Sequence, residues 1–211
     1  KRLPNDEWSM PQNLGPKINT PYNEEGPYMH PDGVTLFFSS EGHKSMGGYD
    51  IFYASIDNET RTCSEPENIG YPINTPDDDV FYIPTPDGKR AYYASHQSDG
   101  LGQSDLYLIT LPESEEKALT VMTGVISLEN GKLPKNVTIK VSDASTNEIM
   151  GVYTPNTKTG KFLFILQPGR KYNVSYESES FLSYTETLDV PKETAYQKLD
   201  RAINLKQVFM K

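Results

Sequence analysis

The feature that most constrains the fold of this chain is a stretch of 49 residues that occurs twice. Residues 8–56 and 63–111 align without a gap at a constant offset of 55 and share fourteen identical positions. Each copy contains Pro-Asp-Gly between two runs rich in apolar residues. Because proline fixes φ and glycine accepts a positive φ, this pattern predicts a β-hairpin in each copy. The first half of the chain is therefore two copies of one supersecondary unit.

Each copy is predicted to contain three or four short strands. Two form the hairpin, a third follows a glycine-rich loop, and a weaker fourth is predicted in the Asn-Leu-Gly or Asn-Ile-Gly segment near the start of the copy. The six stronger strands are expected at Gly26–His30, Val34–Ser40, Tyr49–Ile56, Val80–Thr85, Arg90–Ser95 and Asp105–Leu111. Short strands with a fixed period are typical of β-propeller blades. We therefore expect an all-β protein in which residues 1–112 form two blades of a partial β-propeller.

Two blades are too few for a complete propeller, because propellers close with about four to eight blades. The open sheet edges of an incomplete propeller invite association with other strands. We expect this chain to be part of a longer propeller protein. The alternative is that several copies of the chain complete the ring together.

The sequence pattern changes after residue 112. Residues 113–118 are rich in charge and serine and are predicted to be a linker. Residues 119–208 then predict a seven-stranded Greek-key sandwich, because short alternating runs recur about every ten residues. The runs are Leu119–Leu128, Val137–Ser142, Glu148–Tyr153, Phe162–Leu166, Tyr172–Tyr176, Tyr184–Val190 and Tyr196–Val208, with turns at 130–131, 143–147, 156–160 and 168–169. The last run also fits a helix.

The charge of the chain is concentrated in its first half. Residues 1–112 carry 7 Lys and Arg against 17 Asp and Glu, whereas residues 113–211 carry 13 against 12. Nucleic acid is therefore not expected as a partner, because phosphate binding needs a basic surface. Cys63 is the only cysteine, which excludes an intrachain disulfide and a thiolate metal cluster. The sequence has no apolar run of about 18 residues, so no membrane-spanning segment is expected in this chain.

No catalytic residues and no cofactor-binding residues are predicted. The sequence lacks the Gly-x-Ser-x-Gly, His-Glu-x-x-His and phosphate-loop patterns. The three histidines, His30, His43 and His96, lie in separate turns or loops, so nothing marks a Ser/His/Asp site. We therefore expect a protein that is not an enzyme and that needs no cofactor.

The only candidate metal ligands are the weak set Asp77, Asp78 and Asp79. Three hard carboxylates near a turn suit Ca²⁺. A solvated acidic turn is the favoured interpretation, because no loop glycine or bidentate glutamate completes a known spacing. Asp50 and Asp105 recur at the same place in the two copies, and we expect them to cap backbone N–H groups rather than to bind a ligand.

Four aromatic residues lie in the middle of predicted strands: Phe37, Phe38, Tyr92 and Tyr93. Because side chains alternate along a strand, Phe38 and Tyr93 are expected on one face of their sheets and Phe37 and Tyr92 on the other. A sugar-stacking platform is one interpretation of this set. Packing between neighbouring sheets is the favoured one, because the residues sit in mid-strand.

Two segments of the first copy carry a resemblance to a known class of repeat. They are Pro31-Asp32-Gly33-x-x-Leu36-Phe37-Phe38-Ser39-Ser40 with Gly47-Gly48-Tyr49-Asp50-Ile51-Phe52, and Trp8-x-x-Pro11-x-Asn13-Leu14-Gly15-x-x-Ile18-Asn19-Thr20. The first resembles propeller repeats of the TolB-like, WD40-like (PD40) class. The second is similar to the form found in OmpA-family outer-membrane proteins of Bacteroidetes-type bacteria. In the second copy Cys63, Gln103 and Ser104 replace Trp8, Gly48 and Tyr49, so that corner is expected to pack differently.

The second half of the chain carries a separate resemblance. Its residues are Thr123-Gly124-Val125, Leu133-Pro134-x-x-Val137-x-Ile139, Thr159-Gly160-Lys161-Phe162-x-Phe164 and Leu166-x-Pro168-Gly169-x-x-Tyr172. Residues 119–206 thereby resemble the carboxypeptidase regulatory-like domain, which is a transthyretin-like sandwich.

The two resemblances together imply a non-catalytic scaffold in a periplasmic assembly associated with the outer membrane. Such proteins link cell-envelope or secretion machinery, including type IX secretion components, to the peptidoglycan. The peptidoglycan contact is expected through a domain outside this chain. The alternative function is a glycan- or peptide-binding accessory of a secreted hydrolase.

Overall fold

The computed structural model of the chain is all-β. It describes residues 7–57, 59–111, 117–128, 136–178, 181–192 and 195–206. These residues form fourteen strands and no helix, so no helix of the described part is long and apolar enough to cross a membrane. The chain divides into two compact units, Leu3–Lys117 and Ala118–Lys211, and the division lies within the predicted linker at 113–118. Residues 112–116 lie outside the described residues.

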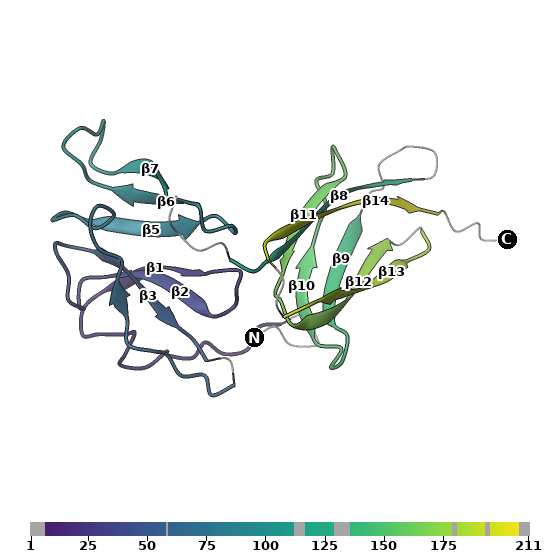
Figure 1. The fold of residues 1–211 in the computed structure, drawn as a ribbon, viewed down its shortest axis with the longest axis horizontal. Coiled ribbons are helices and arrows are strands. Elements are labelled where there is room, and N and C mark those ends of the chain that lie inside the picture. The colour runs from purple at the N-terminus through teal and green to yellow at the C-terminus, as the bar shows by residue number, and fades with distance from the viewer. Residues whose placement is uncertain are drawn as a thin grey trace. The chain divides into compact units, whose positions relative to one another are not determined.

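The first unit contains one antiparallel sheet for each repeat (Figure 1). The first sheet has the order β1-β2-β3-β4, with strands β1 (Glu24–Met29), β2 (Thr35–Ser40), β3 (Asp50–Ser55) and β4 (Glu67–Asn68). The second has the order β5-β6-β7, with strands β5 (Asp79–Pro84), β6 (Arg90–Ser95) and β7 (Asp105–Thr110). Neither sheet closes on itself. Strand β4 belongs to the second repeat, so the second repeat contributes the last strand of the first repeat's sheet.

The six stronger strands predicted from the repeats are confirmed. The weaker fourth strand is confirmed in the second copy, where β4 pairs with β3. In the first copy the prediction is wrong, because residues 13–15 are not part of any strand. The physical reason is the lack of a partner: no strand of the described residues lies beside residues 13–15 to supply the ladder hydrogen bonds.

The Pro-Asp-Gly turn is held by the carboxylate of Asp32. Its Oδ1 accepts hydrogen bonds from the N–H groups of Val34 (2.9 Å) and Thr35 (2.8 Å), and Gly33 has a φ of 72°. Burial alone would raise the pKa of Asp32, but the hydrogen bonds from His30, Thr35 and Val34 bring it well below its usual range. The ionised Asp32 therefore stabilises the hairpin.

One further carboxylate lies at the start of each sheet, Glu24 in the first sheet and Asp79 in the second. Glu24 accepts hydrogen bonds from the N–H and the hydroxyl of Thr20, and Asp79 accepts the same pair from Thr75. Ser40 donates to Glu24 at 3.0 Å, across the sheet. Burial raises the pKa of Asp79, and the nearby charge of Asp50 raises it as well. Ionisation of Asp79 therefore lowers the stability of the folded state relative to its protonated form, whereas ionisation of Asp32 raises it.

The prediction that these aromatic residues pack between neighbouring sheets is confirmed for Phe37 and Tyr93 and is wrong for Phe38 and Tyr92. The ring of Phe37 packs against Tyr82 of β5 with 5.1 Å between ring centroids, and Tyr93 is buried in the same cluster. Phe38 is buried in a separate cluster with Ile18 and Phe52, which contains no residue of the second sheet. Strand β5 lies against β1, β2 and β3, which closes the core between the two sheets. Tyr92 is exposed, because no sheet in the described part of the chain covers its side of the second sheet.

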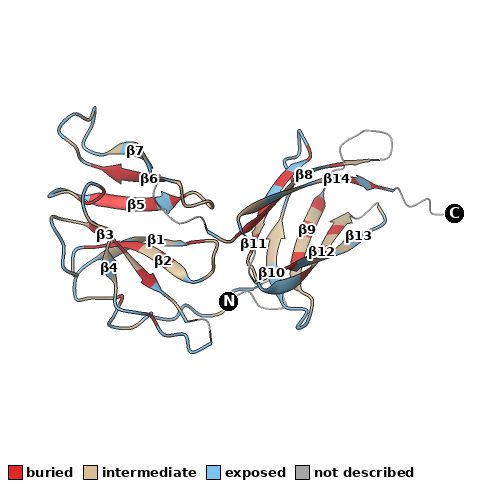
Figure 2. Cartoon of the chain, in the orientation of Figure 1, coloured by how far each residue is buried: buried red, intermediate tan, exposed pale blue. Residues whose placement is uncertain are grey.

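The second unit consists of two sheets that enclose one apolar core (Figures 1 and 2). Their orders are β10-β9-β12-β13 and β11-β8-β14. The strands are β8 (Thr120–Leu128), β9 (Val137–Asp143), β10 (Ile149–Tyr153), β11 (Lys161–Leu166), β12 (Arg170–Ser178), β13 (Tyr184–Val190) and β14 (Gln197–Leu205). The seven predicted strands are present, and the last run is a strand parallel to β8 rather than a helix. The predicted turn at 130–131 and the segment 133–134 lie outside the described residues.

The opposite pKa shifts of Asp32 and Asp79 predict opposite pH dependences. The folded pKa of Asp32 lies below the unfolded value of about 3.9, so its contribution is present above that pH and is lost as the pH falls. We expect Asp32→Asn to lower the free energy of unfolding by about 1–3 kcal/mol at pH 7 and by less below about pH 4. Because the Asp79 pKa is raised, Asp79→Asn should gain stability relative to the wild type as the pH rises from 4 to 7. Urea denaturation at several pH values measures both, and parallel pH profiles of the two variants would contradict the assignment.

Candidate functional site

A buried, fully hydrogen-bonded asparagine joins the second repeat to the first. Asn74 is fully buried, and its side-chain amide contacts the backbone of Ile51 in β3. The N–H of Ile51 donates to Asn74 Oδ1 at 2.8 Å, and Asn74 Nδ2 donates to the carbonyl of Ile51 at 2.9 Å. The amide thus replaces the hydrogen bonds of a neighbouring strand beyond the short β4.

A second asparagine completes this joint. Asn68 Oδ1 accepts hydrogen bonds from Gly70 N–H and from Asn74 Nδ2, both at 2.8 Å, and Gly70 has a φ of 81°. Asn68 Nδ2 donates to Asp50 Oδ2 at 2.9 Å. The same oxygen accepts the N–H of Met46, so Asp50 holds its own loop and the next repeat at once. The predicted capping role of Asp50 is confirmed.

The first repeat carries the same asparagines without a strand to receive them. Asn13 Oδ1 accepts hydrogen bonds from Gly15 N–H at 2.8 Å and from Asn19 Nδ2 at 3.0 Å, and Gly15 has a φ of 87°. This is the arrangement of Asn68, Gly70 and Asn74, 55 residues earlier. No backbone group of a described strand is hydrogen-bonded to the Asn19 side chain, which is only partly buried.

The second sheet lacks the matching fourth strand at its other end. In the described part of the chain, no strand pairs with the outer edge of β7. Leu106 stands where Ile51 stands in the first sheet, and it is 84% exposed, whereas Ile51 is fully buried. The capping role of Asp105 is confirmed, since its Oδ2 accepts the N–H groups of Leu101 at 2.6 Å and Gly102 at 3.1 Å. The β7 edge therefore keeps the local structure of the β3 edge, but none of the described strands pairs with it.

The outer face of the second sheet carries an exposed apolar row. Ile83, Tyr92 and Leu108 are direct cross-strand neighbours on β5, β6 and β7, and they are 45, 49 and 54% exposed. The equivalent row in the first sheet is Tyr28, Phe37 and Tyr53, which is partly buried. Figure 2 shows β7 in the tan and pale blue of partly buried and exposed residues. We call Ile83, Tyr92 and Leu108 the open row.

The predicted metal ligands do not converge. Asp77 and Asp78 are exposed, Asp78 Oδ1 accepts the N–H of Tyr49 at 3.0 Å, and buried Asp79 is bonded to Thr75. The described residues contain no group of three or more His, Cys, Asp or Glu side chains that could hold a metal ion.

The histidines lie in separate places. His30 is buried beside Asp32, with 3.1 Å between its Nδ1 and Asp32 Oδ2. The ring of His43 packs against Phe38 and Phe52, and its Nε2 lies 3.1 Å from the carbonyl oxygen of Ile18. His96 is exposed. Each of the two buried or half-buried rings holds a turn or loop in place, and the structure brings none of the three together.

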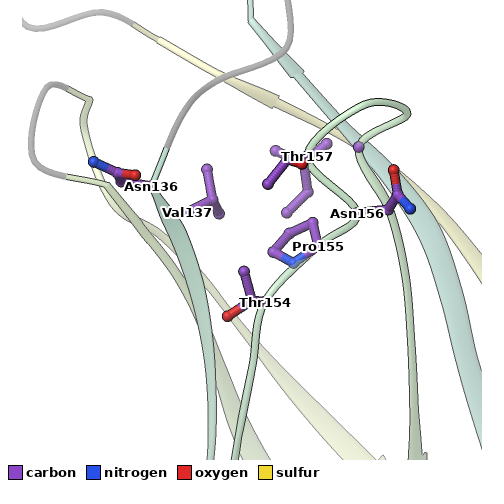
Figure 3. A pocket seen from close by; sticks show the side chains of 8 residues that line it. Asn136, Val137, Thr154, Pro155, Asn156 and Thr157 are labelled. Atoms are coloured by element: carbon purple, nitrogen blue, oxygen red, sulfur yellow. The ribbon is translucent and has the colours of Figure 1, made fainter.

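A small cavity lies at one end of the second unit (Figure 3). It is formed between the start of β9 at Val137 and the segment Thr154–Thr157, and its volume is about 70 Å³. Pockets for small molecules occupy roughly 300–1,000 Å³. The cavity has room for a few water molecules, not for a metabolite.

The comparisons with known proteins assign neither a family nor a function. No protein-family model and no curated protein matches the chain. Solved structures similar to it include a 3-chlorocatechol 1,2-dioxygenase from Rhodococcus opacus, with 11% identity over 46% of this chain and 62% of that chain and a TM-score of 0.29. The Bacillus anthracis TIE protein has 12% identity over 74% of this chain and 28% of its own, with a TM-score of 0.36. A streptococcal ancillary pilin has 8% identity over 75% and 51%, with a TM-score of 0.35. The match spans less than two thirds of each of these proteins, and the similarity is too low to carry an argument.

Sequence reasoning missed the asparagine joint. The repeat pattern predicts a weak strand at the Asn-Leu-Gly and Asn-Ile-Gly segments but assigns no role to Asn19 or Asn74. A usable signal was present, because Asn13, Asn19 and their counterparts are among the fourteen identities of the repeat. Polar residues that stay identical while the strand residues diverge indicate a specific hydrogen-bonding role.

Asn74 and Asn19 form a matched pair for mutation. Asn74→Ala leaves the buried N–H of Ile51 without a partner and removes one of the two donors to its carbonyl, which still accepts the N–H of Ile69. We therefore expect it to lower the free energy of unfolding by about 1–3 kcal/mol. Asn19→Ala removes the same side chain where no described backbone uses it, so we expect a change within about 0.5 kcal/mol. Urea denaturation measures both. Equal losses in the two variants would contradict the role given to the joint.

Chelation tests the metal candidates. Because Asp77, Asp78 and Asp79 have separate partners, we expect the melting temperature to be the same in EDTA and in millimolar Ca²⁺. The control is Asp77→Asn, which alters the acidic turn without touching buried Asp79. If EDTA lowers the melting temperature of the wild type but not that of Asp77→Asn, a calcium site at this turn would be established.

Proposed function

We propose that the chain is a non-catalytic interaction module of a periplasmic assembly associated with the outer membrane. In this proposal its first unit is two consecutive blades of a β-propeller and its second unit is a transthyretin-like sandwich. The offset of 55, one sheet per repeat and the strand that passes from the second repeat to the first sheet all support the blade assignment. The partners are cell-envelope or secretion proteins, and peptidoglycan is reached through a domain outside this chain.

The open row is the observation that carries the proposal. Three apolar residues in register on neighbouring strands form a continuous exposed patch, with Leu106 beside them on β7. Exposed patches of this kind mark interaction sites. The row is a flat sheet face rather than a pocket, which suits a protein surface better than a small substrate. The equivalent row of the first sheet is partly buried, with Phe37 packed against Tyr82 of the second sheet, and this supports a protein surface as the partner of the open row.

Capture from an envelope extract tests the proposal. We expect the wild-type chain to recover envelope or secretion proteins, and Leu108→Asp to weaken their capture on the order of tenfold, because a charge is placed in the apolar row. Leu101→Asp is the matched control, since Leu101 is a fully exposed leucine in a loop outside the row.

Three outcomes of this experiment would contradict the proposal. Recovery of no envelope or secretion protein would contradict the scaffold role. Equal loss of capture in Leu101→Asp and Leu108→Asp would remove the open row as the site. Binding to a glycan array that is lost in Tyr92→Ala would replace the scaffold with the carbohydrate-binding accessory.

A further inference from the structure

We propose that the outer edge of β7 binds the opening segment of a second copy of this chain, residues 8–20. The copies then join head to tail through the same joint that links the two repeats within one chain. This inference rests on the proposed interaction role, because it names the occupant of the same sheet. The occupant is a second copy because, among the described residues, each chain has both a donor half and an acceptor half of the joint that nothing fills.

The acceptor half of the joint is Leu106 on β7. In the first sheet, Ser39 and Ile51 are opposite each other, and the N–H and carbonyl of Ile51 point outward to Asn74. In the second sheet Ala94 and Leu106 are opposite each other at the same register. Since N–H and carbonyl directions alternate along an antiparallel strand, the N–H and carbonyl of Leu106 also point outward. They are placed to receive an asparagine amide.

The donor half of the joint is Asn13 with Asn19. Their mutual hydrogen bond and the positive φ of Gly15 already hold the conformation that Asn68, Gly70 and Asn74 have when bound. The Asn19 amide is therefore preorganised for Leu106 of another copy, which lowers the entropy lost on binding. Asn13 Nδ2 corresponds to Asn68 Nδ2, which donates to Asp50. In the joined copies its acceptor is Asp105.

The neighbouring faces also correspond. Within the chain, Tyr82 of β5 is buried against Phe37 of the first sheet. The residue 55 positions before Tyr82 is Pro27, which is exposed on β1, and Met29 beside it is 43% exposed. When residues 8–20 of a second copy occupy the β7 edge, its Pro27 lies over Tyr92 as Tyr82 lies over Phe37. The exposed open row of one copy and the exposed side of β1 in the next are buried together.

The joint predicts the size of the assembly. A head-to-tail contact is heterologous and produces a ring when the rotation closes. Each chain supplies two sheets, and β-propeller rings close with about four to eight sheets, one sheet for each blade. The expected assemblies are therefore rings of about two to four copies of the 23.8 kDa chain.

The test uses two variants that each remove one half of the joint. Asn13→Ala/Asn19→Ala removes the donor half and keeps β7, whereas Leu106→Pro removes the outward N–H and keeps residues 8–20. Proline is tolerated on an edge strand where the N–H faces solvent, and circular dichroism with thermal melting checks that both variants fold. If Leu106→Pro does not fold, Leu106→Asp is the second acceptor variant.

Analytical ultracentrifugation of the full chain over a range of concentrations gives the readout. We expect the wild type to form closed assemblies, and each variant alone to associate more weakly by on the order of tenfold or more. An equimolar mixture of the two variants should form a 1:1 dimer and nothing larger, because only one intact joint is available. Apolar association without the joint does not produce this complementation.

The inference and the proposed function fail in different ways. A wild-type chain that stays monomeric at all concentrations, or variants that do not complement each other, would overturn the head-to-tail joint. If capture of envelope proteins still depends on Leu108 in that case, the interaction role stands and the occupant of the sheet is a different protein. If the copies join but no envelope protein is captured, the joint stands and the scaffold role falls.

Discussion

The first unit depends on one buried amide. A sheet edge inside a protein needs partners for its N–H and carbonyl groups, and an edge left in water recruits other strands. Strand β4 is only two residues long and cannot cover the whole edge of β3. Beyond β4, Asn74 bonds both backbone groups of Ile51, whose carbonyl also accepts the N–H of Ile69. Asn68 fixes the Asn74 side chain and reaches Asp50. The tight turn at Gly70 brings the two asparagines together.

This way of joining repeats has a consequence for the whole array. Among the described residues, the second repeat gives its opening segment to the sheet of the first repeat, which leaves one unused segment in the first repeat and one open edge in the second sheet. In this chain the unused segment contains Asn13 and Asn19, and the open edge is β7 with Leu106. The same arrangement leaves the row of Ile83, Tyr92 and Leu108 exposed, whereas its counterpart in the first sheet is partly buried. Both the joint between the repeats and the exposed apolar row therefore follow from the transfer of an opening segment to the previous sheet.

Much of the fold could be predicted from sequence because its causes are local. The hairpins follow from Pro-Asp-Gly, in which Asp32 bonds the next backbone N–H groups and Gly33 supplies a positive φ. The capping by Asp50 and Asp105 is local in the same way. What could not be predicted depends on neighbours far away in the sequence. Asn74 has a role only because Ile51 lies beside it, Tyr92 is exposed only because no described sheet covers it, and residues 13–15 are not a strand for want of a partner.

The central claim is that the β7 edge is an unfilled copy of the β3 edge, and backbone hydrogen exchange at two residues tests it most directly. In dilute protein, the Ile51 amide should exchange orders of magnitude more slowly than the Leu106 amide, because only Ile51 N–H has a buried acceptor. At concentrations where copies join, the Leu106 amide should become protected while Ile51 is unchanged. Equal protection of both amides in the dilute protein would contradict the account, and so would a Leu106 amide that exchanges equally fast at every concentration.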